Sequence, residues 1–494
     1  MSKAIRSWFD ALTDVRREEV RPLILMIMYG FMAMTSYYVV KPVRNAVFVD
    51  RVGADNLPYV YMLTAVIVSV IMVFYSRWVH KVGHKTLLIG TFAFLASNLL
   101  AFRWLLLLKE DIVVSGAFYI WGKLYPLLVV SQFWLVGNLI WTTRQAKRLF
   151  GPVGLGLIMG GIAGSAVTGW ATAALGTENL LLVTAGMLGV CAILVLMLDS
   201  EIGKGETGQA RLVGNLSKDA FRLLRESPNL RMISFILMIT ILVSTLLDWQ
   251  FNQAVEAFIP GEDAKTVFFG RFNLFLNIAS VLIQLLLTSF VLGRFGVGVA
   301  LLVLPVALLL ANVGMALVPI LLMATFAKGS EGAIRYSLDQ STRELLFLPV
   351  PTDVKYKVKP LIDLAVYRGG TGLGGLILLV ATNGLGMGMR GVAVLSVALV
   401  CVWVAATFKM KREFKDSVKR LIGISDLGLT QMIAARVGEQ PTETLRSGLQ
   451  GDDEQEIVYS LGLIRHQDPL AFTKELRELL QHESADVKSR ARWA

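Results

Sequence analysis

The sequence predicts an all-α, polytopic membrane protein. Its 494 residues are 55% hydrophobic and its mean hydropathy is +0.60, whereas the apolar share of soluble proteins is about 45 to 50%. Twelve segments reach or approach the length of about 20 residues that a helix needs to span a membrane. No alternation of the kind found in membrane β-strands accompanies them. We therefore predict twelve transmembrane helices.

The twelve predicted spans fall into two blocks of six. They are residues 22–42, 57–78, 86–108, 113–139, 152–175 and 180–198, then 230–253, 267–292, 297–317, 320–346, 361–382 and 390–409. The fourth and tenth spans both carry charges, and the fifth and eleventh are both rich in glycine. This correspondence predicts two pseudo-symmetric six-helix halves with a substrate site between them, the arrangement of many secondary transporters.

The same pattern predicts four regions. They are an N-terminal transmembrane half (1–198), a polar cytoplasmic linker (199–229), a C-terminal transmembrane half (230–410) and a cytoplasmic helical segment (411–494). In the last region, residues 452–465 and 470–481 form an amphipathic pair that resembles a HEAT-type repeat. A further helix begins near residue 484, and solenoids generally need about three units. We expect either a truncated repeat or one that docks on the membrane domain, with a protein partner as its candidate ligand.

The net charge of +11 follows the predicted topology rather than one domain. Basic residues gather before the first span and in even-numbered connections, including Arg77, Lys81, Lys85, Arg144, Lys147, Arg148, Lys355, Lys357 and Lys359. Odd-numbered connections hold only isolated basic residues. By the positive-inside rule both termini are cytoplasmic. The distribution favours a lipid bilayer as the basic residues' surroundings and gives no support for nucleic-acid binding.

A charged stripe in residues 324–349 is the strongest functional signal. Five residues of alternating charge recur every three or four positions, which places them on one face of a helix: Lys328, Glu331, Arg335, Asp339 and Arg343. Ionised groups at membrane depth are costly unless they meet a partner or water. We favour a helix that lines a transport pathway, with an amphipathic helix at the membrane surface as the alternative.

Charges in three other predicted spans extend this interpretation. The first span ends with Lys41, Pro42 and Arg44, where we expect the proline to break the helix beside a substrate site. The alternative is that both cations extend to the outer membrane surface. Lys123 lies near the start of the fourth span, and Asp248 lies in the seventh among aliphatic residues. We expect Asp248 to pair with Lys41 or Arg44.

Glycines recur at two places that matter for helix packing. Gly156, Gly160 and Gly164 form a ridge in the fifth span that predicts the close approach of another helix. The run 369–375 in the eleventh span contains five glycines. It predicts either a kink or backbone N–H groups that are open to an anion.

The chain offers no signature of catalysis. The segment nearest to a P-loop, residues 116–124, has the wrong spacing and no Ser or Thr after Lys123, so ATP hydrolysis is not expected. His80 and His84 lie in a basic turn, and Cys191 and Cys401 lie inside predicted spans. We therefore predict no catalytic residue, no metal site and no cofactor, and we do not expect an enzyme.

Two stretches resemble the bacterial and plastid ATP/ADP antiporter family. They are GKLYPLLVVSQFWLVGNLIWTTRQAKRLFGPVGLG, which begins at Gly122, and RYSLDQSTRELLFLPVPTDVKYKVKPLID, which begins at Arg335. The resemblance extends over about residues 22 to 410. It implies a major-facilitator-like architecture, exchange of nucleotides without hydrolysis, and residence in the cytoplasmic (inner) membrane of a bacterium. Many bacterial relatives carry HEAT-like extensions.

The resemblance also assigns residues. Lys41 and Arg44 match the family's basic pair in the first helix, with the two basic types exchanged, and Asp248 matches an acidic residue of the seventh. The chain differs from the family at Lys123, where the family has an acidic residue, at Asn45, which replaces another acidic residue, and at Thr371, which replaces a lysine.

Together these observations predict a secondary transporter of nucleotides or related phosphorylated anions that works by alternating access. The predicted phosphate ligands are Lys41, Arg44 and Arg335, followed by Lys123 and Lys328. Asp248, Glu331 and Asp339 complete the predicted site as acidic partners. The alternative is a transporter-derived scaffold or sensor whose HEAT-like segment binds a protein partner.

Overall fold

The computed structural model describes most of the chain. It covers residues 15–79, 83–108, 111–199, 201, 222–225, 227–347, 350, 352–422, 449–450, 457, 461, 472–482, 484, 487–488 and 491. The described residues are helical throughout, apart from the turns and short connections between helices. Their architecture is therefore all-α, as the sequence predicts.

The first six predicted spans lie in helices α2 (Arg17–Arg51), α3 (Leu57–Val79), α4 (His84–Leu108), α5 (Ile112–Ile140), α6 (Thr143–Leu175) and α7 (Leu180–Met197). The next three lie in α9 (Pro228–Phe258), in α10 (Glu262–Leu282) with a π-helical segment (Ile283–Thr288), and in α11 (Ser289–Leu317). The tenth span lies in α12 (Leu321–Ile334), a π-helical segment (Arg335–Asp339) and α13 (Gln340–Leu346). The eleventh lies in α14 (Thr352–Leu361), a π-helical segment (Ile362–Val366), α15 (Tyr367–Leu379) and a second π-helical segment (Val380–Gly384). The twelfth lies in α16 (Met389–Ile422).

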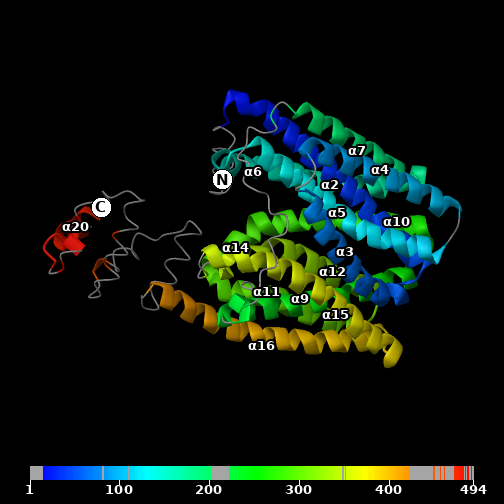
Figure 1. Ribbon diagram of the computed structural model, residues 1–494. Helices are drawn as coiled ribbons and strands as arrows, with labels where there is room; N and C mark the ends of the chain where they lie inside the picture. Colours follow the sequence, from blue (N-terminus) through cyan, green and yellow to red (C-terminus); the bar gives the residue numbers. More distant parts are fainter. Residues whose placement is uncertain are drawn as a thin grey trace.

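The helices form two groups, seen in Figure 1 as an upper blue and cyan group and a lower green to orange group. Packing inside one group has a counterpart inside the other. Helix α2 contacts α5, α6 and α7, and α9 contacts α12, α15 and α16; likewise α4 contacts α7, and α11 contacts α16. The two halves are thus pseudo-symmetric.

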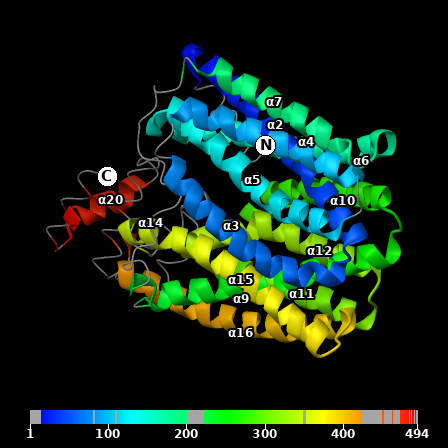
Figure 2. The same ribbon diagram turned by 45° about the vertical axis from the view of Figure 1, so that its right-hand side comes forward.

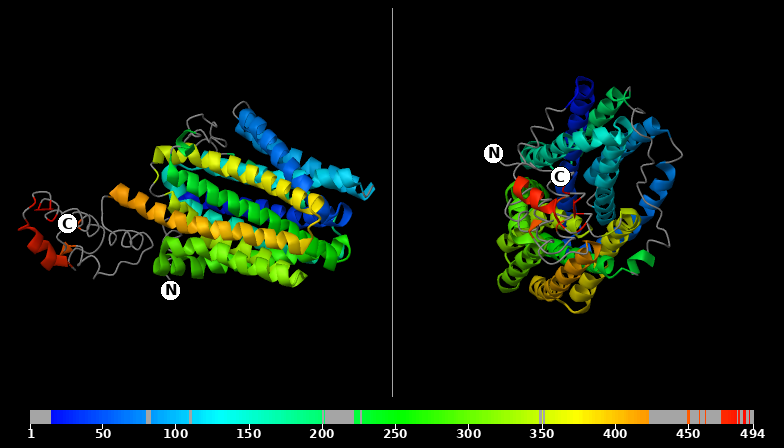
Figure 3. Two further views of the ribbon diagram at one scale, coloured as in Figure 1. Left: turned by 90° about the horizontal axis from the view of Figure 1, so that it is seen from below. Right: turned by 90° about the vertical axis from the view of Figure 1, so that its left-hand side faces the viewer.

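Two helices lie beside the opposite group. Helix α3 of the first half packs along α15 of the second, and α10 of the second half packs along α6 of the first. Figure 2 shows α3 beside α15, and both views of Figure 3 show the two groups lying against each other. These two symmetry-related contacts join the halves along their length.

Equivalent glycines mark the same turn in each half. Gly53 follows α2 with φ of 87°, and Gly261 follows α9 with φ of 81°. Residues with a Cβ rarely adopt these left-handed angles, so glycine is the natural residue at both turns. The repeated turn supports a duplicated six-helix unit.

The predicted glycine ridge explains how closely α6 approaches α2. A Cβ on Gly156, Gly160 or Gly164 would lie only 2.3 to 2.4 Å from carbonyl oxygens of α2. The second glycine run also serves packing, because a Cβ on Gly374 would meet Thr245 at 2.8 Å and one on Gly375 would meet the Pro58 carbonyl oxygen at 2.8 Å. The small residues therefore let backbones approach each other.

Nine helical stretches among the described residues are long and apolar enough to cross a membrane. One of them, Glu262–Leu317, contains 56 residues and bends at Gly296, where φ is 74°. Two predicted spans, 320–346 and 361–382, are helical but are not among the nine. Both include π-helical segments, and the first carries the charged stripe. The count of twelve crossings stays a prediction.

The expected break at Pro42 is wrong, because α2 is continuous through this residue. Proline lacks the N–H group that would bond to the Tyr38 carbonyl oxygen one turn earlier. The Thr168 hydroxyl of α6 donates to that oxygen instead, at 3.3 Å. Since a neighbouring helix satisfies the freed carbonyl, the helix needs no break.

The structure describes only part of the predicted C-terminal helical segment. Helix α20 (Thr473–Leu479) lies within the predicted segment 470–481, and most of 452–465 lies outside the described residues. The buried residues of this region cluster together: Leu449, Ile457, Leu461, Phe472, Leu479, Val487 and Ala491. The HEAT-like repeat stays a prediction, and the predicted linker is largely outside the described residues as well.

Candidate functional site

A cavity of about 640 Å³ lies between the two halves. Helices α2, α3 and α5 supply one wall, and α9, α10, α12 and α15 supply the other, together with the first π-helical turn after α12. Six cationic side chains and two carboxylates line it: Lys41, Arg44, Lys123, Lys328, Arg335, Arg368, Asp248 and Glu331. The lining therefore has a formal excess of four positive charges, which favours an anionic occupant.

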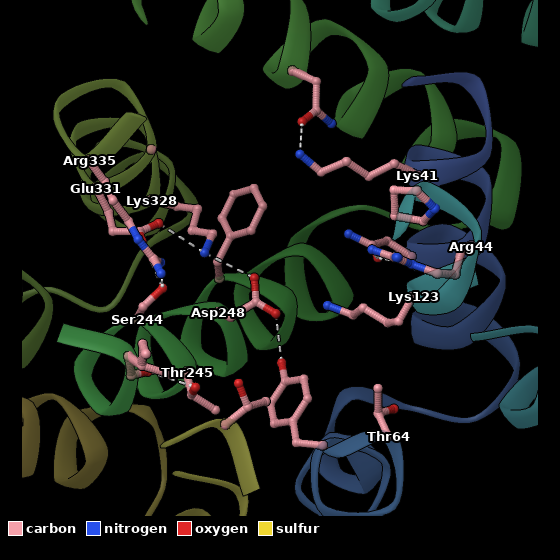
Figure 4. Close-up of a pocket in the computed structure, with 18 of the residues that line it drawn as sticks. Lys41, Arg44, Thr64, Lys123, Ser244, Thr245, Asp248, Lys328, Glu331 and Arg335 are labelled. Carbon is pink, nitrogen blue, oxygen red and sulfur yellow. Dashed lines mark hydrogen bonds and ion pairs between the residues drawn. The ribbon is translucent and has the colours of Figure 1, made fainter. Parts of the chain in front are cut away.

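Seven of the eight residues that the sequence singles out line this cavity. Figure 4 shows Lys41, Arg44 and Lys123 pointing into it from one side and Lys328, Glu331 and Arg335 lying on the other, with Asp248 between them. We call these two sets of side chains the N-terminal wall and the C-terminal wall. Asp248 comes from α9 and is counted with the C-terminal wall.

Two cations of the C-terminal wall, Lys328 and Arg335, are paired with carboxylates. Lys328 Nζ lies 3.0 Å from Asp248 Oδ1 and 3.2 Å from Glu331 Oε2. Arg335 Nη1 donates to Glu331 Oε1 at 2.7 Å and to the Ser244 hydroxyl at 2.8 Å. Glu331 accepts from both cations and from Ser244. The wall is thus one connected network with little uncompensated charge.

The expectation that Asp248 pairs with Lys41 or Arg44 is wrong. Its carboxylate pairs with Lys328 and accepts from the Tyr61 hydroxyl at 2.8 Å, rather than from Lys41 or Arg44. Helix α12 packs directly against α9 in the same half, so Lys328 reaches this carboxylate without crossing the cavity. The hydroxyl of Tyr61, on α3, gives Asp248 a hydrogen bond to the first half.

Among the described residues, the cations of the N-terminal wall form no ion pair within 4 Å, although Asp248 acts on Lys41 and Lys123 electrostatically from across the cavity. Lys41 Nζ donates to the Asn273 amide oxygen at 2.7 Å. Arg44 is 3% exposed and donates only to neutral oxygens. Lys123 Nζ lies 5.2 Å from the centroid of the Tyr119 ring, and the Arg44 guanidinium carbon lies 5.1 Å from the same centroid. The two walls therefore differ sharply in charge compensation.

Gly122 and Pro126 of α5 hold Arg44 in place. Because proline has no N–H group, the Gly122 carbonyl oxygen four residues earlier lacks its helical partner; Arg44 Nη1 donates to it at 2.9 Å. A Cβ on Gly122 would lie 2.4 Å from Arg44 Cδ, so the arginine passes where a side chain would be. This arrangement positions a buried guanidinium without a counter-ion.

Asp339 is the one predicted site residue that does not line the cavity. It lies at the end of the π-helical segment Arg335–Asp339, and its carboxylate pairs with Arg343 at 3.1 Å. In a π-helix residues five apart, rather than four, lie above one another. The wider turn moves Asp339 off the face shared by Glu331 and Arg335; its role in binding stays a prediction.

Sequence reasoning missed several residues that shape the cavity, including Tyr61, Gly122 and Pro126. For the last two a signal was present, since a glycine four residues before a proline marks an exposed carbonyl oxygen with no Cβ beside it. The sequence carries no such signal for Tyr61, because its hydrogen bond to Asp248 depends on how α3 packs against the other half. Among the described residues, no cluster of His, Cys, Asp or Glu could hold a metal ion.

One end of the bundle is joined by polar contacts between the halves. We call it the odd end; it carries the connections after α2, α4, α6 and α9. Arg51 pairs with Glu262 of the other half at 2.6 Å and with Glu178 of its own half at 2.7 Å, and Lys265 pairs with Asp50 across the halves at 2.5 Å. Further contacts between the halves join Thr177 to Asp263, Ala54 to Glu256 and Gln253 to Asp55.

At the opposite end, which we call the even end, described ion pairs join residues of the same half. Arg148 pairs with Glu19 at 2.6 Å, and Lys359 pairs with Glu344. Tyr336 lines the cavity on this side and is 63% exposed, whereas Phe269, which lines it nearer the odd end, is 1% exposed. Because the described polar contacts that join the halves lie at the odd end, we expect the cavity to open toward the even end.

Comparisons with known proteins agree with this architecture. The model of the TLC ATP/ADP transporter family matches residues 95–329. ADP,ATP carrier protein 1 of Chlamydia pneumoniae is 22% identical, over 82% of this chain and 93% of its own, and ADP,ATP carrier protein 4 of Rickettsia felis is 21% identical, over 84% and 97%. The chain thus carries an ATP/ADP-transporter match over residues 95–329 and is similar to these carriers over most of its length. Together with the long apolar helices, these matches indicate a multi-pass membrane transporter rather than an enzyme.

Solved structures show the same fold at low sequence identity. The nucleoside transporter NupG has a TM-score of 0.57 and 12% identity, over 80% of this chain and 99% of its own. A bacterial homologue of the lysosomal transporter Spinster, in an inward-facing and unoccupied conformation, has a TM-score of 0.56 and 14% identity, over 82% and 99%. These likenesses show that the chain shares the fold of these solved proteins.

Proposed function

We propose that this protein exchanges a nucleotide or a related phosphorylated anion across a membrane by alternating access, without hydrolysing it. The observation that carries the proposal is a cavity between two pseudo-symmetric halves whose lining has a formal excess of four positive charges. Its relatives add support, because the similar proteins from Chlamydia and Rickettsia are named ADP,ATP carriers. ATP and ADP are therefore the first substrates to test.

The lining suits such a substrate in both charge and shape. A volume of about 640 Å³ lies within the range of about 300 to 1,000 Å³ typical of small-molecule sites. Arginine and lysine N–H groups bind phosphate oxygens as charge-assisted donors. Tyr37, Phe272 and Tyr367 also line the cavity and offer ring faces to a base. We assign substrate binding to the seven predicted residues that line the cavity, and we assign Asp339 an indirect contribution.

The orientation and regions are also part of the proposal. The basic even-numbered connections support cytoplasmic termini, and the bacterial relatives support an inner-membrane location in a bacterium. The cavity would then open toward the cytoplasm in this structure. We keep the regions 1–198, 199–229, 230–410 and 411–494 as two transmembrane halves, a cytoplasmic linker and a cytoplasmic helical segment.

Counterflow in proteoliposomes tests this function. Vesicles loaded with unlabelled ATP or ADP should accumulate labelled ADP from outside, and empty vesicles should not. A panel with AMP, sugar phosphates and inorganic phosphate identifies the preferred anion. Equal, non-saturable uptake of labelled ADP by loaded and empty vesicles would contradict exchange.

The scaffold alternative is not favoured by the chain's relatives, and a protein partner for the C-terminal segment stays a proposal. Deleting residues 416–494 separates these roles. Counterflow should persist in the truncated protein, because the cavity is built from α2 to α15. Loss of exchange by a truncated protein that is folded and monodisperse would assign the C-terminal segment a part in transport.

A further inference from the structure

The N-terminal wall contains a guanidinium whose hydrogen bonds are only partly used. Arginine has five N–H donors. In Arg44, Nε and Nη2 donate to the Asn45 side-chain oxygen at 3.1 and 2.9 Å, and Nη1 donates to the Gly122 carbonyl oxygen at 2.9 Å. Two N–H groups, one on each terminal nitrogen, have no partner among the described residues. A buried charged donor without a partner is costly, so it points to a ligand.

Lys123 adds a second incomplete cation beside the first. Its ammonium group and the Arg44 guanidinium lie at nearly equal distances from the Tyr119 ring centroid, 5.2 and 5.1 Å. No hydrogen bond and no ion pair within 4 Å is described for the ammonium, and the carboxylate that acts on it electrostatically, Asp248, is already paired with Lys328. Two cations that share one ring repel each other when no anion is present. An anion that bridges them would remove this repulsion and use their free donors.

We infer that one phosphate group of the transported anion binds between Arg44 and Lys123, in a subsite built by Gly122, Tyr119 and Pro126. The inference rests on the proposed function and narrows it, because it selects two of the six cavity cations as the primary phosphate ligands. The free guanidinium N–H groups supply two donors, and the ammonium supplies three more. Lys41 lies on the same wall and adds positive charge nearby.

The C-terminal wall is a poorer first site for a phosphate. Glu331 contacts Lys328 at 3.2 Å and Arg335 at 2.7 Å, and Asp248 also pairs with Lys328. An anion that binds there would have to displace one of these carboxylates from its cation. Each displaced carboxylate would then lack its partner inside the cavity. The N-terminal wall requires no such exchange.

Asn45 and Pro126 preserve this difference between the walls. An amide oxygen at residue 45 holds Arg44 in place while leaving its charge uncompensated, which a carboxylate would not do. Pro126 keeps the Gly122 carbonyl oxygen free to accept from Arg44, because the proline has no N–H group to compete for it. The subsite is thus positioned by neutral groups and charged only by its cations.

Binding of ADP, adenosine and inorganic pyrophosphate to purified full-length protein tests the subsite. Lys123→Met keeps a long side chain but removes the charge, and it should weaken ADP binding by about tenfold or more, as expected for the loss of a hydrogen-bonded charge. Adenosine binding should change by less than about twofold, because adenosine has no phosphate. Lys123→Arg should recover most of the lost ADP affinity.

Two further variants control for charge and for geometry. Arg368→Gln removes another cavity cation outside the subsite, and it should weaken ADP binding by less than about threefold. Gly122→Ala keeps every charge but places a Cβ against Arg44, and it should weaken ADP and pyrophosphate binding to a similar extent as Lys123→Met. Thermal melting of each variant checks its folding. If Gly122→Ala is misfolded, the Lys123 and Arg368 variants decide the result.

The outcomes separate the subsite from the proposed function. ADP affinity that is unchanged by Lys123→Met, or equally reduced by Arg368→Gln, would overturn the subsite while leaving nucleotide exchange intact. If the wild-type protein binds pyrophosphate but neither binds nor exchanges ADP, nucleotide exchange is overturned. The effect of Lys123→Met on pyrophosphate binding then decides the subsite. Wild-type protein that binds neither anion would overturn the subsite.

Discussion

The two ends of the helix bundle differ in how the halves are held together. At the odd end, charged contacts cross between the halves, with Arg51 on Glu262 and Lys265 on Asp50. At the even end, ion pairs such as that of Arg148 with Glu19 stay within one half. We therefore expect the cavity, which the exposed Tyr336 lines, to open toward the even end.

This difference shows which contacts must break for the cavity to open the other way. Alternating access requires one half to rock against the other around the site. The helix pairs α3 with α15 and α6 with α10 join the halves along their length and can act as the packed interface in this motion. The polar contacts at the odd end must separate each time, so substitutions there should act on conformation more strongly than those at the even end.

The largest expected effect is that of a covalent lock at the odd end. The Thr177 hydroxyl lies 2.6 Å from the Asp263 carboxylate across the two halves. Thr177→Cys combined with Asp263→Cys, in a background with both native cysteines replaced, should form a disulfide that stops counterflow and leaves ADP binding in place. A reducing agent should restore exchange. Full counterflow by the oxidised protein would show that this end does not open.

Removing the central arginine of the odd end should have the next largest effect. Arg51→Ala leaves Glu178 and Glu262, which both contact the arginine, without their cation. Loss of one member of a buried pair typically costs about 3 to 5 kcal/mol. We therefore expect a clearly lower melting temperature in detergent, and faster labelling of a cysteine at residue 64 from the odd side. A melting temperature within error of wild type would contradict the proposed importance of this contact.

The contact between Tyr61 and Asp248 tests the middle of the interface. Tyr61→Phe removes one hydrogen bond to a carboxylate that keeps its ion pair with Lys328. Hydrogen bonds to charged groups contribute about 1.5 to 3 kcal/mol. The expected result is a moderate loss of thermal stability, together with faster counterflow if this contact slows the separation of the halves. Asp248→Asn should cost more, because it also leaves Lys328 with only Glu331.

The smallest effect is expected at the even end. Lys85→Met breaks the ion pair with Asp199, in which both side chains are exposed and both residues belong to the first half. Exposed ion pairs contribute about 0 to 1 kcal/mol. Melting temperature and counterflow should both stay close to wild type. A marked change in either would mean that this end also restrains the halves.

The sequence by itself determined the class of the protein and the location of its charges. Hydrophobic length fixed the helices, because a bilayer admits only segments whose backbone bonds are satisfied internally. The glycine spacing in α6 predicted its close approach to α2, and the charged spans predicted a polar cavity. Positions such as Lys41, Arg335 and Asp248 could be found because charge is conspicuous in apolar spans.

Only the tertiary structure decided which charges meet. Asp248 pairs with Lys328 rather than with Arg44, because α12 packs on α9 in the same half while α2 lies across the cavity. A π-helical turn moved Asp339 off the charged face, and Thr168 kept α2 continuous at Pro42. These outcomes depend on helix crossings between residues far apart in sequence, whereas periodicity reports only the faces of a single helix.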